Sequence, residues 1–273
     1  MLDMQTCFLS EMGGRSRNED ACGYWTSDDG CCWVVSDGAG GHGSGDVASR
    51  LVVSTVLRRF SAHPRVEPDE ASNLLQAAND VVVGEKTNGN TRDDMHATAV
   101  VLLIDPRSGL AVWGHVGDTR IYLFRRGRVA YQTRDHSLVQ NMIDAGYGST
   151  DMIRTHPQRS LLTSAIGSAE SLSLSVSAEP LALQVGDVFL LCTDGWWEYV
   201  EESDMEQILG ESVSSEAWLA SMGELIRSRA PAENDNYTAV CVRMADEPDG
   251  DETTVIIPST PRRSEEHTSE LQS

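Results

Sequence analysis

The stretch Val34–Asp46, VVSDGAGGHGSGD, joins an apolar run to a helical pattern and contains the first indication of the fold. Within it, Gly38–Gly43 matches the dinucleotide-binding pattern G-x-G-x-x-G. A dinucleotide site also needs an acidic residue about 20 positions further on, after a second strand. Here that distance falls inside a predicted helix, at Arg58 and Arg59. Asp37 would also direct a negative charge at the pyrophosphate. The pattern therefore argues against nucleotide binding and makes Asp37 the residue to explain.

Composition limits the classes of protein that need to be considered. The chain has 273 residues, 40% of them hydrophobic, which suffices for one large domain. Its formal net charge of −21 disfavours nucleic acid and anionic membranes as partners. No apolar run approaches the ~18 residues of a membrane-spanning helix, and no secretory pattern opens the chain. The six cysteines are scattered without a C-x-x-C pair, which predicts buried free thiols and a reducing cytoplasm.

Short apolar strands outnumber helices and are mostly joined by turns, which favours an α+β sandwich over a βαβ array. The predicted strands are Met4–Leu9, Cys31–Ser36, His96–Ile104, Ala111–Val116, Arg120–Phe124, Leu172–Ser177, Asp187–Cys192 and Tyr237–Val242. The predicted helices are Ser44–His63, Glu67–Lys86, Ser137–Ala145, Glu201–Leu209 and Ser215–Arg229. The polar stretch Asp151–Arg159 predicts a loop or flap.

The composition changes near the C-terminus and divides the chain into three parts. Residues 1–245 form the predicted domain. Residues 246–262 are acidic and contain proline, which predicts a flexible tail. Residues 263–273, RSEEHTSELQS, resemble the translation of a sequencing adapter, so they are excluded from reasoning about fold and function.

Asp37 is one of several acids expected at or just after the end of an apolar strand; the others are Glu19, Asp20, Asp118, Asp194 and Asp235. Each alone is better explained as a turn residue. However, S-D-G at 36–38 and T-D-G at 193–195 are twin motifs after strands apolar enough to be central. If those strands are neighbours, the carboxylates converge, and they must then protonate or bind a cation. Acids without Cys or His partners suit Mg²⁺ or Mn²⁺.

Six short motifs occur in one order along the chain: R-x-R-N-E-D, S-D-G-x-G-G-H, G-D-T-R, R-D-H-S, T-D-G-W-W-E and D-N-Y-T-A-V. This order resembles the metal-dependent PP2C (PPM) family of protein Ser/Thr phosphatases in its bacterial form, over Gln5–Met244. The resemblance implies a four-layer α/β/β/α sandwich, with two antiparallel sheets flanked by helices. It also implies hydrolysis of phosphoserine and phosphothreonine.

The resemblance implies a metal-ligand set. Asp37 would bridge two ions, and the Gly38 carbonyl would ligate one of them. Asp194 and Asp235 would complete the other site. Asp118 would hold a third, weaker ion together with Asp194. Two divalent ions lower the pKa of a water, so that hydroxide is available to attack phosphorus near neutral pH.

The remaining implied roles concern waters, phosphate and protons. Glu19 and Asp20 would hold metal-bound waters. Arg15 would grip the substrate phosphate, with Arg17 as a nearer alternative. His42 is a candidate for the acid that protonates the leaving oxygen, and a metal-bound water is the alternative proton donor. If the water serves, His42 is a residue at the start of the helix without a catalytic task.

The expected partners are phosphorylated Ser/Thr proteins and a cognate bacterial Ser/Thr kinase. Related short members occur beside type VI secretion genes, an analogy only. Thr253 and Thr254 each follow acids and precede an Ile by three residues, which resembles the phosphothreonine motifs of forkhead-associated domains. An unmodified linker is the alternative. Two other functions stay open, a non-catalytic phosphoprotein-binding homologue and a small-molecule phosphatase.

Three further features receive structural interpretations. Trp196 and Trp197 are expected to pack in the core. Asp135 or Ser137 is expected to cap the helix that follows. The flap, about Gln140–Leu161, gives no indication of substrate choice.

Overall fold

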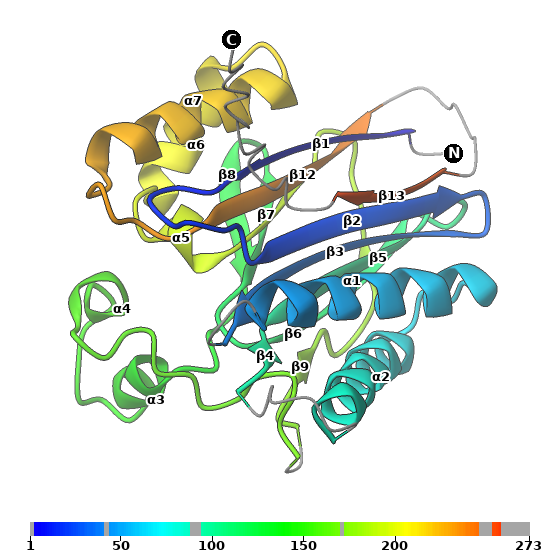
Figure 1. Ribbon diagram of the computed structural model, residues 1–273. Coiled ribbons are helices and arrows are strands. Elements are labelled where there is room, and N and C mark those ends of the chain that lie inside the picture. Colours follow the sequence, from blue (N-terminus) through cyan, green and yellow to red (C-terminus); the bar gives the residue numbers. More distant parts are fainter. Residues whose placement is uncertain (1–2, 41–43, 88–93, 170–171, 246–252, 258–273) are drawn as a thin grey trace, which may run out of the picture.

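The computed structural model describes residues 3–40, 44–87, 94–169, 172–245 and 253–257. Every pair of neighbouring strands is antiparallel, and the strands form two sheets that face each other (Figure 1). The first sheet has the order β1-β12-β11-β7-β8. Its strands are β1 (Asp3–Glu11), β12 (Tyr237–Ala245), β11 (Val188–Cys192), β7 (Arg120–Arg125) and β8 (Arg128–Gln132).

The second sheet has the order β10-β6-β5-β3-β2-β13, with β4 paired to β3 and β9 to β6. Its strands are β10 (Leu181–Ala182), β6 (Leu110–Val116), β5 (Ala99–Asp105), β3 (Gly30–Ala39), β2 (Asp20–Ser27), β13 (Thr253–Ile257), β4 (His96–Ala97) and β9 (Ser175–Val176).

Helices cover the outer face of each sheet (Figure 1). Two helices pack on the second sheet: α1 (Gly45–Ala62) and α2 (Pro68–Thr87). Three pack on the first sheet: α5 (Asp194–Trp197), α6 (Glu202–Glu211) and α7 (Ser215–Arg229). The short helices α3 (Leu138–Asp144) and α4 (Met152–Thr155) lie to one side of the sandwich (Figure 1).

The two-residue period of a strand produces these layers, because successive side chains point to opposite faces of a sheet. In β3, Val34 belongs to the apolar cluster beneath α1 and α2, whereas Trp33 and Val35 belong to the cluster between the two sheets. In β11, Leu190 faces the helices of the first sheet and Leu191 faces the second sheet. The predicted four-layer α+β sandwich is confirmed.

Several element predictions differ from the structure. Strands β2, β8 and β10 were not predicted, and the expected strand Leu172–Ser177 shortens to β9. The expected loop Asp151–Arg159 contains α4. β2 and β8 have no polar-apolar alternation, since β2 is buried along most of its length and β8 is largely exposed. The prediction missed β2 because Gly23 and polar residues at both ends interrupt its apolar run, and it missed β8 because that strand is short and exposed.

The predicted flexible tail contains a strand. Residues 253–257 form β13, which pairs with β2 through Thr253↔Thr26 to Ile257↔Cys22. Five consecutive β-branched residues favour a strand, and β2 would otherwise leave its hydrogen-bonding edge unpaired. The predicted end of the domain at residue 245 and the predicted end of the tail at residue 262 stay predictions.

The cysteine prediction is confirmed, because all six thiols are free and buried. In the part of the chain that the structure describes, the longest helices are too polar to cross a membrane.

Candidate active site

The second sheet contributes two neighbouring acids at one end of the sandwich. Asp37 lies near the end of β3, and Asp20 is the first residue of β2. The two residues are direct cross-strand partners in the β2–β3 register. Because direct partners in an antiparallel pair stand about 5 Å apart, their carboxylates are held close together by backbone pairing alone.

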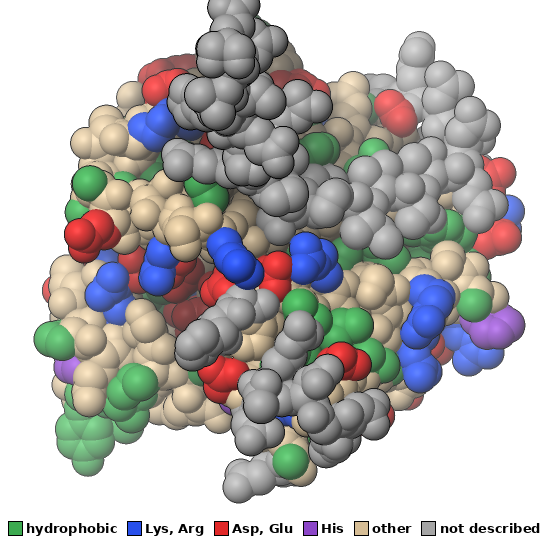
Figure 2. Space-filling model, viewed as in Figure 1, with side chains coloured by type: hydrophobic (Ala, Val, Ile, Leu, Met, Phe, Trp, Pro, Cys, Tyr) green, Lys and Arg blue, Asp and Glu red, His purple; other side chains and the backbone are tan. Residues whose placement is uncertain are grey.

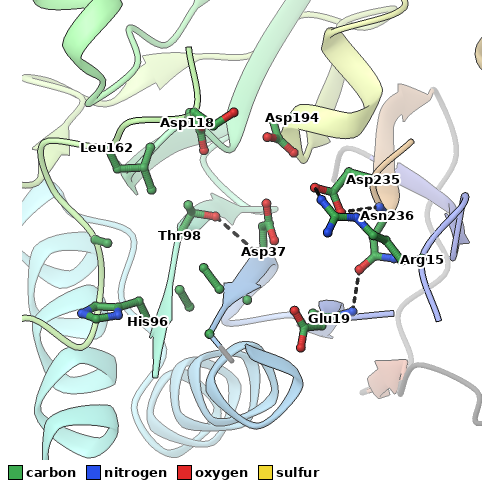
Figure 3. Close-up of a pocket in the computed structure, with 16 residues that line it drawn as sticks. Arg15, Glu19, Asp37, His96, Thr98, Asp118, Leu162, Asp194, Asp235 and Asn236 are labelled. Atoms are coloured by element: carbon green, nitrogen blue, oxygen red, sulfur yellow. Dashed lines mark hydrogen bonds and ion pairs between the residues drawn. The ribbon is translucent and has the colours of Figure 1, made fainter. Parts of the chain in front are cut away.

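Threonine side chains and backbone contacts fix Asp37. The Asp37 amide donates to Thr98 Oγ1 at 3.2 Å, and the Thr98 amide donates to the Asp37 carbonyl at 2.8 Å (Figure 3). Gly38 lies against the start of α1, since a Cβ there would stand 2.0 Å from the Gly45 carbonyl oxygen. The glycine after Asp37 thus lets the helix N-terminus approach the acid.

Asp194 comes from the first sheet, and Asp118 comes from the connection between the two sheets. Asp194 opens α5 directly after β11, and Asp118 lies in the turn between β6 and β7. The Trp197 indole donates to the Asp118 carbonyl at 2.9 Å, which ties the two segments together. Thr193, beside Asp194, donates to Asp20 Oδ2 at 2.9 Å and so connects the two sheets at the site.

Asn236 holds the loop that carries Arg15 and Glu19. Its side-chain amide donates to the carbonyls of Met12 and Arg17, at 2.8 Å each. Its oxygen accepts from the Glu19 amide at 2.8 Å (Figure 3). Beside it, Asp235 forms an ion pair of 2.6 Å with Arg15 (Figure 3). A single side chain therefore places the arginine, Glu19 and Asp235 in fixed relation.

These segments surround a cavity of about 360 Å³. Seven of the predicted site residues line it: Arg15, Glu19, Asp37, Gly38, Asp118, Asp194 and Asp235. Their side chains point toward one another from both sheets (Figure 3). Figure 2 shows acidic side chains within a recess that Lys and Arg side chains border. Asp20 lies behind the wall with 2% exposure, and His42 lies outside the described residues.

Burial and mutual repulsion raise the pKa values of these acids. Burial raises the pKa of Asp20 to about 7, and it raises that of Asp118 to about 7 with a further contribution from Asp135. The pKa values of Asp37 and Asp194 are raised well above the usual range by burial and then by the neighbouring carboxylates. Burial and the charge of Asp46 raise the pKa of Glu19. Carboxylates in this state bind protons or cations.

The residues fit hard divalent cations. The buried atoms Asp20 Oδ1 and Asp194 Oδ1 have no hydrogen-bond partner, and an unpartnered buried carboxylate oxygen is costly unless it binds something. The cavity presents carboxylate and carbonyl oxygens, which Mg²⁺ and Mn²⁺ prefer. Within the described residues, no three of the acids stand close enough to enclose an ion as a group.

Two details of the predicted acids are corrected. Asp20 is the first residue of β2, Glu19 precedes it, and Asp235 precedes β12, so these three do not follow the end of an apolar strand. The twin motifs are also not on hydrogen-bonded neighbours. Strands β3 and β11 belong to different sheets, and their acids meet across the sandwich.

Sequence reasoning missed three residues that position the site: Thr98, Asn236 and Asp46. Asn236 belongs to a quoted motif, but its side-chain contacts join segments 217 to 224 positions apart, which no local pattern reveals. Asp46 raises the Glu19 pKa from the first turn of α1. Its place in the opening stretch, at the start of the predicted helix, is the signal that could have found it.

The structural interpretations of the other motifs hold. Trp196 and Trp197 are buried in the core beneath α5–α7. Ser137 caps α3 by accepting from the Gln140 amide at 3.1 Å. Asp135 instead forms a buried two-bond ion pair with Arg120, at 2.8 and 2.7 Å. The Arg120 guanidinium stacks 3.5 Å from the centre of the Trp197 ring and so supports the segment after Asp194.

The cavity is lined by oxygen atoms, has the Arg15 guanidinium at its edge and lies where two antiparallel sheets meet. Such a cavity suits a phosphate ester bound through divalent ions. Residues 10–228 match the family described as protein phosphatase 2C. Because the match spans most of the chain, the chain belongs to this family, and the predicted resemblance is confirmed.

Two of the following relatives are described as serine/threonine phosphatases, and the two solved structures share the fold of this chain. The serine/threonine phosphatase stp of Listeria monocytogenes is 31% identical over 201 residues, which cover 71% of this chain and 78% of that protein. The structure of PppA, described as a key regulatory component of T6SS in Pseudomonas aeruginosa, is 32% identical, with a TM-score of 0.71 over 88% of this chain and 97% of that one. The catalytic domain of the phosphatase PstP, solved with two manganese ions, shares the fold at 24% identity, with a TM-score of 0.74 over 90% of this chain and all of that one.

Proposed function

We propose that this protein is a metal-dependent protein serine/threonine phosphatase. One observation carries the proposal: acids from both sheets converge with Arg15 on one cavity, in a chain of the protein phosphatase 2C family. Bound divalent ions, Mg²⁺ or Mn²⁺, would supply a water nucleophile near neutral pH and neutralise charge on the phosphate. The manganese-bound relative supports this cofactor class.

The chain's own residues would hold these ions and the substrate. We assign Asp37 as a ligand of two ions. The Gly38 carbonyl would be a further ligand of one ion, and Asp194 and Asp235 would be ligands of the other. Asp118 and Asp194 would together hold a third, weaker ion. The Asp37 carboxylate suits the bridging role because it points into the cavity between acids of both sheets (Figure 3).

Arg15, Glu19 and Asp20 would orient the reactants. Arg15 lines the cavity and would donate two parallel hydrogen bonds to phosphate oxygens. It would then exchange its present partner Asp235 for the substrate. Glu19 lines the cavity and Asp20 lies behind it, and both would accept hydrogen bonds from waters on the ions.

The proton for the leaving Ser or Thr oxygen would come from His42 or from a water. His96 also lines the cavity, but both ring nitrogens have partners, Lys86 Nζ at 3.1 Å and the Asp94 carbonyl at 3.0 Å. These contacts leave His96 poorly placed to donate a proton to the substrate.

Hydrolysis assays test the proposal directly. A phosphothreonine peptide and p-nitrophenyl phosphate are assayed with Mn²⁺ and with EDTA. Hydrolysis of the peptide that EDTA abolishes supports the proposal. Activity that EDTA leaves unchanged rejects the metal mechanism. Binding of the peptide without any turnover identifies a non-catalytic phosphoprotein-binding homologue, and turnover of the small ester alone identifies a small-molecule phosphatase.

The physiological role follows from the substrate class. We propose that the enzyme acts in the cytoplasm and opposes a bacterial Ser/Thr kinase. Its Pseudomonas relative is described as a regulator of type VI secretion, so a kinase associated with such a system is the first to test. Co-expression that leaves the kinase phosphorylated would contradict this assignment.

A forkhead-associated domain is a proposed partner through Thr253 or Thr254. Both residues lie in β13, whose backbone pairs with β2. A kinase or a forkhead-associated domain would therefore bind this segment only after it leaves the sheet. Phosphoproteomics with the kinase present tests the idea, and an absence of phosphate at both threonines rejects it.

A further inference from the structure

Arg17 lies two residues beyond Arg15 but faces a different space. A second cavity, of about 440 Å³, adjoins the acid-lined one. Both cavities are lined by Arg15, Glu19, Gly40, Asp235 and Asn236. Arg17 and Ser16 line only the second. This arrangement gives Arg15 access to the reacting phosphate and places Arg17 beside it.

The backbone at Arg17 is fixed, whereas its charged group is available. The Arg17 carbonyl accepts from Asn236 at 2.8 Å, and the preceding Gly13 packs so tightly that a Cβ would lie 2.2 Å from the Asp235 carbonyl oxygen. The side chain is exposed, and within the described part of the chain its guanidinium has no ion pair or hydrogen bond. Arg15, by contrast, is paired with Asp235.

An available cation at this place has a specific consequence for substrates. The chain's net charge of −21 repels acidic peptides at a distance, so an anionic peptide needs a local cation to bind well. Residues in an extended peptide advance about 3.3 Å each. A group one or two positions from the phosphothreonine therefore reaches the adjoining cavity.

We propose that Arg17 is a specificity-determining residue that selects substrates with a second anionic group next to the phosphorylated residue. This inference rests on the proposed phosphatase function. The anion is either a carboxylate or a second phosphate. An exposed arginine–carboxylate pair is weak, whereas a phosphate accepts two parallel hydrogen bonds from a guanidinium. The preference is therefore expected to be larger for a second phosphate.

Three matched peptides test the proposal with the full-length protein and Mn²⁺. Each contains one phosphothreonine, and the positions within two residues of it contain only Ala, one Glu, or one phosphoserine. For the unmodified protein, kcat/KM is expected to rise about 3-fold with Glu and about 10-fold with phosphoserine relative to Ala, mainly through KM. The Glu peptide and the phosphoserine peptide distinguish a preference for a carboxylate from a preference for a phosphate.

Variants of Arg17 then identify the residue responsible. Arg17→Ala should bring both ratios close to one, and Arg17→Glu should invert them, so that the doubly phosphorylated peptide becomes the poorest substrate. Arg58→Ala removes the same charge from an exposed position far along α1 and should keep the ratios.

Three results would overturn the inference. The first is a set of ratios that Arg17→Ala does not change. The second is a loss of kcat/KM in Arg17→Ala that is equal for all three peptides, since Arg17 would then act on the reacting phosphate or on the loop. The third is equal hydrolysis of all three peptides by the unmodified protein, which rejects this inference alone. Failure to hydrolyse any of them rejects the phosphatase function itself.

Discussion

The segments Ser36-Asp37-Gly38 and Thr193-Asp194-Gly195 have nearly the same sequence but continue into different structures. The first remains in β3, and Gly38 pairs with Ala97 of β4. The second ends β11 and opens helix α5. Both place an aspartate at the cavity and a glycine against the backbone of another segment. A Cβ at Gly38 would lie 2.0 Å from a carbonyl oxygen, and a Cβ at Gly195 would lie 2.1 Å from one. The comparison teaches that the acid and the small residue are the shared requirement, while the neighbours decide the path of the chain.

The largest expected effect comes from neutralising either aspartate. Asp37→Asn and Asp194→Asn should each lower kcat/KM for a phosphothreonine peptide by about 10³-fold or more, because charge stabilisation at the reacting phosphate is lost. Asp37 should be the more sensitive if it contacts both ions. Asp28→Asn, an exposed acid in the β2–β3 turn, is the control and should keep full activity. Retention of a tenth of the activity in either site variant would contradict the assignment.

Substitution of either glycine by alanine should lower stability by a similar amount, even though Gly38 lies in a strand and Gly195 in a helix. Gly38→Ala and Gly195→Ala should each lower the free energy of unfolding by about 3 kcal/mol, because the new methyl group meets rigid backbone. Urea unfolding measures the change. Gly84→Ala in α2 is the matched control. Among the described residues, no atom other than those of its own helix backbone and chain neighbours lies within 4 Å of its Cβ position, so it should stabilise by about 0.5–1 kcal/mol. A site glycine that behaves like Gly84 would show that the close approach is not rigid.

The acids should make the metal-free protein less stable at high pH. The folded pKa values of Asp20 and Asp118 are raised to about 7 by burial, above the ~3.9 of an unfolded aspartate. The folded state thus binds more protons between these values, so stability is present at low pH and is lost as the pH rises from about 4 to about 7. In EDTA, Tm should fall by about 5 °C or more between pH 5 and pH 8. Mn²⁺ should abolish this fall, and a Tm that instead rises over this range in EDTA would contradict the prediction.

Thr193 and Ser36, the residues before the two aspartates, should differ in how much they contribute to stability. Thr193 Oγ1 donates to Asp20 Oδ2 and accepts from the Thr238 amide at 3.0 Å. Ser36 Oγ makes one bond, to the Thr98 carbonyl at 2.6 Å. Thr193→Val leaves two buried groups without partners and should cost about 2–3 kcal/mol; Ser36→Ala should cost about 1 kcal/mol. Urea unfolding of both variants checks the order, and equal costs would show that the bond to Asp20 adds nothing.

The predictable part of the fold is the part with a clear period. Strands β3, β5 and β11 are apolar on both faces or alternate regularly, and their predicted ranges overlap the observed ones. β2 and β8 escaped prediction because Gly23 and polar residues at both ends interrupt the apolar run of β2, and because β8 is short and largely exposed. β13 escaped because its short acidic context indicates a tail, and only the unpaired edge of β2 turns it into a strand.

The predictable part of the site is its chemistry. The acids are visible as a set because each stands beside a strand or turn, and the order of the motifs identifies the family. Their geometry is not visible, because Thr98, Thr193 and Asn236 act through partners distant in the sequence. The metal roles of the acids stay predictions that the proposed assays test.

The hydrophobic period and residue chemistry of the amino-acid sequence determined the α+β sandwich, the buried thiols and the set of acids, because these are local properties. The four-layer order was implied by the resemblance of the motifs to the phosphatase family. Only the tertiary structure decided that the twin aspartates meet across two sheets and not side by side within one. Only the tertiary structure separated Arg15 from Arg17, which differ by two positions in the chain but border different cavities. The physical reason is that distance through space depends on pairing and close backbone contacts, which form between segments far apart in the chain.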